Sequence, residues 1–336
     1  MTRVLVIRFS SMGDIILTAP VINALRQTYP DLTLDYLVHE QFQTLVSHFD
    51  PPPERVIPFP AAMKATRLPA YARELAQADY DLVLDLHDSL RSKLLRRFFP
   101  EAQRRVYRKP RLKRWLLFNL WINRFPPDFS VVNEYLRYAG LDLPAKERQP
   151  RMSLGADESM EVLRRYGLEP GYLACVPGAA WPQKSWLKER YIELFGQRLA
   201  SHLGRVVLLG GPHDTICDEI ARSLDGTKVT NLKGKTRLAE ALALLSRSHG
   251  VVGSDTGLVH AAEALGVPVV MILGPTSRET GAHTHNPASQ VHEVPLWCRP
   301  CSQNGRRSCY RQEQYCLTGT TVDQVGVSID RIMGWA

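Results

Sequence analysis

The sequence lacks any long hydrophobic run. Its apolar stretches, such as residues 267–273, fall far short of the roughly 20 residues that a membrane-spanning helix needs. Close to the N-terminus, residues 4–7 are too few for the apolar core of a signal peptide, and Arg8 follows them directly. Both absences argue against membrane insertion and secretion, so we expect a cytoplasmic protein.

A dinucleotide-binding fingerprint is also missing. Residues 8–14 form the turn after the first apolar segment, and they contain one glycine where G-x-G-x-x-G has three. This argues against NAD at that position. We find no internal repeat beyond two α/β halves. The chain has 336 residues, of which 44% are hydrophobic and 23% are charged, and these values suit a globular protein of two domains.

Acidic residues are nearly absent from one stretch. Residues 91–124 contain 12 Lys and Arg and a single acid, Glu101, whereas the rest of the chain has a net charge of −3. This basic segment fits three interpretations: a surface for carboxylates and phosphates, a nucleic-acid site, or a solvated basic face. No nucleic-acid motif accompanies the charge, so we expect no nucleic-acid partner.

Cysteine is scarce except in one loop. Of six cysteines, four lie at Cys298, Cys301, Cys309 and Cys316. In a reducing cytoplasm a metal is favoured over a disulfide, and four thiolates suit a structural zinc or iron site. The spacing is not that of a common zinc ribbon, and the alternative is four reduced thiols without a ligand.

The most informative stretch is residues 250–277, which read as strand, turn, helix and strand. Small and capping residues fill the turn at 253–257, and apolar residues then recur at 258, 261, 262 and 265 with helical spacing. Gly266 and Pro268 end the helix before an apolar strand at 269–273. A glycine-containing turn at a helix start suits a phosphate or pyrophosphate. The alternative is an ordinary βα turn capped by Ser254 or Asp255.

Strand and helix patterns alternate along both halves of the chain. We expect strands at 4–7, 33–38, 56–58 and 81–86, then at 172–176, 206–209, 251–252 and 269–273. The intervening segments carry helical periodicity, including 15–29, while most of 100–150 has no clear pattern. This alternation predicts the α/β class with doubly wound sheets. We expect domains at 1–155 and 156–320 and a closing helix within 321–336.

Two further turns carry chemically useful side chains. Asp14 follows the first strand and is either a carboxylate at the edge of a sheet or a helix cap, a role that Ser10 and Ser11 could also fill. Lys184 follows the strand at 172–176 and is either a phosphate ligand or a surface lysine in a loop.

These motifs together resemble the bacterial ADP-heptose:lipopolysaccharide heptosyltransferases, glycosyltransferase family 9. The resemblance rests on IRFSSMGD at 7–14, PGAAWPQKSW at 177–186, SDTGLVHAA at 254–262 and GPT at 274–276, in that order. It implies the GT-B fold, in which two Rossmann-like domains face a central cleft. It also implies inversion at the anomeric carbon and no cofactor for catalysis.

The resemblance implies roles for individual residues. Asp14 matches the general base and Lys184 the lysine on the donor diphosphate. Thr256, Gly257 and Leu258 match the turn whose amides bind that diphosphate, and Asp255 matches an acid near the donor sugar. Asp214 lies where the family has an acid on the ribose. His260 belongs to the motif, and a packing role is the alternative. Ala179 and Ala180 depart from members that have hydroxyls there.

The same resemblance implies the partners. The donor is ADP-L-glycero-D-manno-heptose, and the acceptor is the inner core of lipopolysaccharide, which is built on lipid A. The residues expected to bind the acceptor are Ser10, Ser11, Lys64, Arg67 and Arg91. Trp115, Phe118 and Trp121 within the basic segment suit peripheral contact with the inner membrane on its cytoplasmic face. We expect a monomer whose closing helix packs on the first domain. The alternatives are a transferase for another nucleotide sugar and a non-catalytic nucleotide-binding protein.

Overall fold

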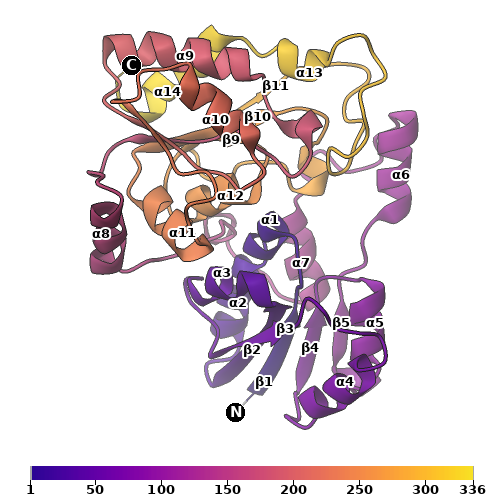
Figure 1. Cartoon of the computed structure of the whole chain (residues 1–336). Helices are drawn as coiled ribbons and strands as arrows, with labels where there is room; N and C mark the ends of the chain where they lie inside the picture. The colour runs from indigo at the N-terminus through magenta and orange to yellow at the C-terminus, as the bar shows by residue number, and fades with distance from the viewer. Residues whose placement is uncertain (1, 336) are drawn as a thin grey trace. The chain divides into compact units, whose positions relative to one another are not determined.

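The computed structural model describes residues 2–335, which divide into two compact units. Unit 1 comprises the chain up to Pro110 together with Asp128–Ser153, and unit 2 comprises Arg111–Pro127 and the chain from Leu154 onward. Each unit is built around one parallel sheet (Figure 1). The expected α/β class with two doubly wound sheets is confirmed. The change of unit at residue 153 lies close to the expected boundary at 155, but residues 111–127 belong to unit 2.

The sheet of unit 1 has the strand order β3-β2-β1-β4-β5, and every pairing is parallel. Its strands are β1 (Thr2–Ile7), β2 (Leu32–His39), β3 (Arg55–Phe59), β4 (Leu82–Asp85) and β5 (Arg104–Val106). Central β1 is apolar on both faces, and Val4, Leu5, Val6 and Ile7 are fully buried. This is the burial expected of a strand covered by helices on both sides.

The helices of unit 1 are α1 (Met12–Ile16), α2 (Ala19–Thr28), α3 (Gln43–Ser47), α4 (Leu68–Ala76), α5 (Leu90–Arg96) and α7 (Val131–Ala139). The single helix expected at 15–29 is thus two helices, and Pro20 lies in the first turn of the second one, where proline is tolerated. Helices α4 and α5 cover one face of the sheet, where Leu68 and Leu95 pack with Leu5 and Ile7. Helix α2 packs against α7.

The sheet of unit 2 has the strand order β11-β10-β9-β6-β7-β8, again parallel throughout. Its strands are β6 (Leu173–Val176), β7 (Val206–Leu208), β8 (Val229–Asn231), β9 (Gly250–Ser254), β10 (Val269–Leu273) and β11 (Gln290–Glu293). Counted from β6, this is the strand order of dinucleotide-binding folds. The edge strands β8 and β11 are short and only partly buried, and their sequences gave no strand pattern.

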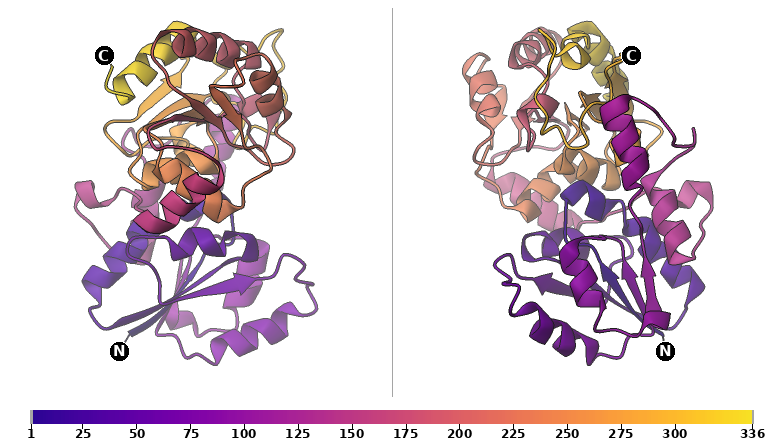
Figure 2. Two further views of the ribbon diagram at one scale, coloured as in Figure 1. Left: turned by 60° about the vertical axis from the view of Figure 1, so that its left-hand side comes forward. Right: turned by 90° about the vertical axis from the view of Figure 1, so that its right-hand side faces the viewer.

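Helices cover both faces of this second sheet (Figure 2). The helices of unit 2 are α6 (Arg111–Leu120), α8 (Ala156–Arg165), α9 (Lys188–Ser201), α10 (Thr215–Arg222), α11 (Leu238–Ser246), α12 (Gly257–Ala264), α13 (Tyr315–Thr318) and α14 (Val322–Ile332), and all but α6 contribute to the layers on the sheet. Alternate residues of β6 face opposite layers: Cys175 packs with α9, α10 and α14, and Ala174 packs with α8, α11 and α12. No helix within residues 2–335 is long and apolar enough to cross a membrane.

Two segments differ from the expectations. Helix α6 lies in the stretch that showed no clear pattern, where Leu117 and Phe118 are buried and anchor it. Helix α14 was expected to pack on the first domain, but it packs on α9 and β10 within unit 2. The reason is its apolar stripe, since Val325 and Ile329 are fully buried in the core of that unit.

Each sheet has one point at which its strand order reverses. In unit 1 this point lies between β1 and β4, and in unit 2 it lies between β6 and β9. Loops from the carboxyl ends of such strand pairs diverge and leave room for a ligand. Residues 8–11, 86–89, 177–187 and 255–256 follow these strands, and they include the sequence motifs that suggested chemistry.

Candidate active site

Three motifs of unit 2 meet at the carboxylate of Asp255. The Lys184 ammonium lies 2.6 Å from Asp255 Oδ2, and the Thr276 hydroxyl donates to the same oxygen at 3.0 Å. His260 Nε2 lies 3.1 Å from the other oxygen, Oδ1. Asp255 and His260 are buried, and Lys184 is largely so. The expected donor residues Lys184, Asp255 and His260 are therefore brought together at the switch point between β6 and β9.

The charge state of this network follows from its partners. Burial disfavours ionisation of Asp255, but the Lys184 ammonium and the His260 hydrogen bond outweigh it and hold the pKa of Asp255 far below its usual range. Asp255 is thus a fixed negative charge at neutral pH. It can orient Lys184, but a carboxylate of such low basicity is poorly suited to accept a proton.

The turn before α12 presents unused hydrogen-bond donors. Thr256 is the N-cap residue of α12 and has extended backbone geometry, yet its hydroxyl makes no capping bond. That hydroxyl is buried, and no partner for it exists among the described residues. The first amides of a helix also lack partners within the helix. Thr256, Gly257 and Leu258 therefore present N–H and O–H donors at the positive end of the helix dipole, as an anion site requires.

Asp214 lies at the carboxyl edge of the same sheet, after β7. Its carboxylate accepts the backbone N–H of Gly211 at 2.7 Å. Gly178 and Gly210 approach it so closely that a Cβ on either one would lie within 3 Å of the carboxylate. In dinucleotide-binding folds an acid after the second strand binds the ribose hydroxyls, and Asp214 occupies that place in the topology.

The loop that carries four cysteines packs against the Lys184 segment. Gln314 Nε2 donates to the Gln183 carbonyl at 2.5 Å, and the Cys301 amide donates to the Pro275 carbonyl at 3.2 Å. Gly305 has a φ of +81°, and its Cα faces the aliphatic stem of Lys184. The loop therefore helps to position the lysine, a role that the sequence did not suggest.

The expected zinc or iron site at Cys298, Cys301, Cys309 and Cys316 finds no support among the described residues. Nowhere in residues 2–335 do three or more His, Cys, Asp or Glu side chains form a group that could hold a metal ion. Two of the thiols make hydrogen bonds: Cys298 accepts from Arg311 at 3.6 Å, and Cys309 donates to the Glu313 carbonyl at 3.7 Å. Burial, together with the nearby cysteines Cys316, Cys298 and Cys309, raises the pKa of Cys301 to about 11, which keeps that thiol protonated at neutral pH.

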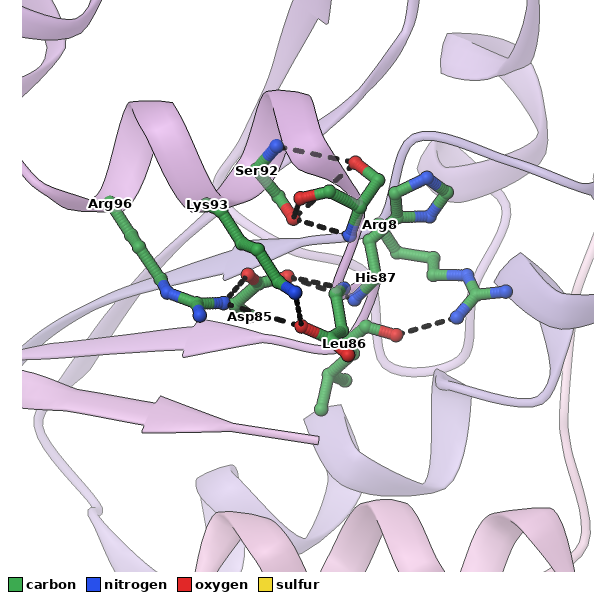
Figure 3. Close-up of polar contacts among 9 residues, drawn as sticks. Arg8, Asp85, Leu86, His87, Ser92, Lys93 and Arg96 are labelled. Carbon is green, nitrogen blue, oxygen red and sulfur yellow. Dashed lines mark hydrogen bonds and ion pairs between the residues drawn. The ribbon is translucent and has the colours of Figure 1, made fainter. Parts of the chain in front are cut away.

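Asp14 in unit 1 is held by two neighbours. Arg8 Nη2 lies 2.8 Å from Asp14 Oδ2, and the Ser11 hydroxyl donates to the same oxygen at 2.8 Å. Arg8 is itself buried and donates to the Leu86 carbonyl at 2.5 Å (Figure 3). The Asp14 side chain remains 33% exposed. Asp14 is therefore a fixed carboxylate that a ligand can reach.

The electrostatics of this site favour the charged form of Asp14. Burial opposes ionisation, but the Arg8 guanidinium and the Ser11 hydrogen bonds outweigh it and lower the pKa of Asp14. His87, after β4, has the opposite environment: burial, aided by Arg8, lowers its pKa to about 3. The site thus contains an ionised aspartate beside a neutral imidazole at physiological pH.

Part of the basic segment has a structural role. The buried carboxylate of Asp85 accepts hydrogen bonds from the backbone N–H groups of His87 at 3.0 Å and Asp88 at 2.9 Å. Two basic side chains add ion pairs: Arg96 pairs with Asp85, and the Lys93 ammonium lies 3.6 Å from the Asp88 carboxylate (Figure 3). These contacts fix the loop after β4. The segment is also divided, because residues 91–110 belong to unit 1 and 111–124 to unit 2. The basic segment therefore contributes side chains to both units.

The expected acceptor residues lie at the surface of unit 1. Ser10 is half-buried, whereas Ser11, Lys64, Arg67 and Arg91 are exposed. Lys64 and Arg67 precede α4, and Arg91 lies in the first turn of α5. Their role as acceptor ligands stays a prediction.

The comparisons with known proteins agree with the fold and the motifs. Residues 69–310 match Glycosyltransferase family 9 (heptosyltransferase), and the chain belongs to this family. It is 26% identical to lipopolysaccharide heptosyltransferase 1 of Pseudomonas aeruginosa, with 98% of each chain covered. It is also 26% identical to lipopolysaccharide heptosyltransferase 2 of Salmonella typhimurium, over 82% of this chain and 83% of that one.

A solved structure shows the same fold. The ADP-heptose lipopolysaccharide heptosyltransferase II of E. coli superimposes with a TM-score of 0.79 at 22% identity, covering 99% of this chain and 98% of that one. The family resemblance and the GT-B class that the sequence suggested are both confirmed. The relatives include both heptosyltransferase 1 and heptosyltransferase 2. The chain is 26% identical to each, so sequence identity does not favour one of these two enzymes over the other.

Three residues at the site were missed from the sequence. Arg8 stood inside the first motif but had no role, although a charge directly after a buried strand could have signalled one. Thr276 follows Gly274-Pro275, and only the fold shows that its hydroxyl reaches Asp255. Gly305 lies far from Lys184 in the sequence and had no detectable signal.

Proposed function

We propose that this protein transfers heptose from ADP-L-glycero-D-manno-heptose to the inner core of lipopolysaccharide, with inversion and without a catalytic metal ion. The observation that carries the proposal is the anion-binding arrangement of unit 2, where the Lys184 ammonium and the start of α12 lie at the switch point of a nucleotide-binding sheet. A full-length likeness to lipopolysaccharide heptosyltransferase 1 supports it. The C-terminal part, residues 156–320, would bind the donor.

The donor side stabilises the leaving group. The Lys184 ammonium and the amides of Thr256, Gly257 and Leu258 would bind the diphosphate, while Asp214 would bind the ribose. When the bond between the anomeric carbon and the diphosphate oxygen breaks, its electron pair stays on ADP, and negative charge grows beside the Lys184 ammonium and the helix amides. Lys184 and the helix amides supply the charge stabilisation that a metal ion gives in other transferases. Asp255, near the donor sugar, keeps Lys184 oriented.

On the acceptor side, the carboxylate of Asp14 would act as the general base. A hydroxyl of the acceptor attacks the anomeric carbon from the face opposite the diphosphate, which inverts that centre. Its proton passes to a carboxylate oxygen of Asp14 as the new carbon–oxygen bond forms. The Arg8 ion pair makes Asp14 a weak base. Proton transfer would therefore occur late, when bond formation has made the attacking oxygen acidic.

The acceptor carries phosphates and carboxylates, which suits basic and hydroxyl side chains. Residues 1–155 would bind it through Lys64, Arg67 and Arg91 together with Ser10 and Ser11, at and around Asp14. We further propose that the enzyme works as a monomer, located peripherally on the cytoplasmic face of the inner membrane.

A panel of donors and acceptors tests the proposal. The purified protein is incubated with ADP-heptose and other nucleotide sugars, each with core acceptors that have no heptose or one heptose. Transfer should occur with ADP-heptose, and the acceptor that is used shows whether the enzyme adds the first or the second heptose. Asp14→Asn should abolish transfer and leave donor binding nearly intact, because Asp14 acts on the acceptor. Turnover of another nucleotide sugar, without any of ADP-heptose, would refute the proposed donor.

A further inference from the structure

Helix α6 of unit 2 has an apolar face that no other part of that unit covers. Leu112 is 71% exposed and Trp115 is 54% exposed, and Leu120 and Ile122 are exposed beside them. The inward side of the same helix is anchored, since Leu117 and Phe118 are buried. Large apolar side chains gathered on one surface helix commonly mark an interaction site.

The cysteine-containing loop extends this face with aromatic rings. The Trp121 ring packs at 5.4 Å from Trp297 and at 6.3 Å from Tyr310, measured between centroids. Trp297 is 66% exposed and Tyr310 is 55% exposed. Arg307 ties the loop to α6 by donating to the Phe118 carbonyl at 2.9 Å. The rings and the helix thus form one surface, which we name the α6 surface: Leu112, Trp115, Leu120, Trp121, Ile122, Trp297 and Tyr310.

The segments that build the α6 surface are strongly basic. Residues 111–124 carry four Lys and Arg and no acid, and residues 296–316 carry four Arg and one Glu. This charge argues against a second copy of the chain as the occupant, because two such surfaces would repel each other. It suits an anionic lipid bilayer, where basic side chains meet headgroups and Trp, Tyr and Leu enter the interface.

We propose that the α6 surface docks the protein on anionic membranes. Helix α6 has ten residues, so it would lie in the interface and not span the bilayer. The inference deepens the proposed function: it rests on the peripheral membrane location proposed above and names the surface that makes the contact. It assigns the seven residues of the α6 surface to the membrane and leaves Lys184 and Asp255 to the transfer reaction.

Vesicle sedimentation with the full chain tests the proposal. The vesicles contain phosphatidylcholine alone or with about one third phosphatidylglycerol, at an ionic strength of about 0.1 M. Binding should require the anionic lipid. Leu112→Ser combined with Trp115→Ser should weaken it at least about tenfold, because two interfacial side chains are lost. Lys113→Glu should weaken it about fivefold or more.

Matched controls lie elsewhere on the chain. Val327 and Trp335 are also an exposed aliphatic residue and an exposed tryptophan of unit 2. Val327→Ser combined with Trp335→Ser should change vesicle binding less than about twofold. Exposed Lys146 offers the same charge reversal in unit 1, and Lys146→Glu should bind like the unchanged protein.

A second readout separates docking from catalysis. The Leu112→Ser/Trp115→Ser variant should transfer normally to a lipid-free core oligosaccharide and poorly to an acceptor embedded in vesicles. Several results would overturn the proposal: no preference for anionic vesicles, equal losses in the Val327/Trp335 control, or a dimer of the unchanged protein that this variant dissolves. The sedimentation assay needs no activity, so its failure would not affect the proposed transfer reaction.

Discussion

The pairing of Arg8 with Asp14 makes a prediction about pH. In the unchanged protein the Arg8 guanidinium, 2.8 Å away, helps to lower the pKa of Asp14. Arg8→Met removes this charge and keeps most of the side-chain volume. Burial then acts with less opposition, so the pKa of Asp14 should rise. Since Asp14 must be ionised to accept a proton, the acidic limb of kcat/KM should move to higher pH.

The size of the shift follows from the exposure of Asp14. An aspartate beside an arginine commonly has its pKa lowered by about 1–3 units. Asp14 is 33% exposed and keeps its Ser11 hydrogen bonds in the variant, so solvent screening favours the lower half of that range. We expect the limb to move by about 1–2 pH units, which corresponds to about 1.4–2.7 kcal/mol.

The measurement is kcat/KM for the acceptor between about pH 3 and pH 8 under saturating donor, because the limb of the unchanged protein lies below the ordinary pKa of an aspartate. Arg8→Lys retains the charge and should keep most of the original profile. Arg96→Met removes another arginine from an ion pair in unit 1, the one with Asp85 (Figure 3). It should reduce stability without moving the limb. If Arg8→Met lowers activity equally at every pH, Arg8 does not set the basicity of Asp14, and our account of the base is incorrect.

Three further predictions concern unit 2. Lys184→Ala should weaken donor binding and slow turnover together, because the lysine contacts the diphosphate before and during bond cleavage; calorimetry showing unchanged donor affinity would exclude that contact. Thr256→Val should weaken donor binding about tenfold without loss of stability, since the hydroxyl has no protein partner in the described chain; equal affinities would remove the hydroxyl from the site. Asp255 has a depressed pKa, so its contribution to stability is present above about pH 4 and is lost as the pH falls towards the folded-state value. Asp255→Asn should accordingly cost about 3 kcal/mol at pH 7 and less at pH 3 in urea unfolding, whereas a pH-independent difference would contradict the linkage.

Much of the fold could be predicted because the central strands are continuous apolar runs. Residues 4–7 and 269–273 need no alternation, since helices bury both faces. The edge strands could not be found, because β8 and β11 are short and half-solvated. Helix α6 was missed for a related reason: only Leu117 and Phe118 are buried, and Leu112, Trp115 and Leu120 face outward.

The candidate site could be predicted where one motif carries both the turn and the reactive group. Asp255 and Gly257 belong to such a motif, and so does Asp14. The contacts that set their chemistry are long-range: Lys184 reaches Asp255 across 71 positions of the sequence, and Arg8 binds the carbonyl of Leu86. The metal prediction rested on spacing alone, and no group of three or more ligand side chains that could hold a metal ion supports it within the described residues.

The loop that was expected to bind metal yields a different prediction, at Gly305. Its φ of +81° is a region that side chains rarely adopt, and a Cβ there would collide with the Lys184 stem. Gly305→Ala should therefore displace Lys184 from Asp255 and raise the donor KM about fivefold or more, together with a stability loss of about 1–2 kcal/mol from backbone strain.

Gly171→Ala is the matched control for Gly305→Ala. Gly171 has a φ of +96°, and no atom lies within 4 Å of the Cβ that alanine would add. It should lose similar stability and keep the donor KM, because only the strain is shared. Thermal unfolding and initial rates of both variants separate the two effects. A normal donor KM in Gly305→Ala would show that the loop does not position Lys184, whereas an equal rise in both variants would attribute the change to strain alone.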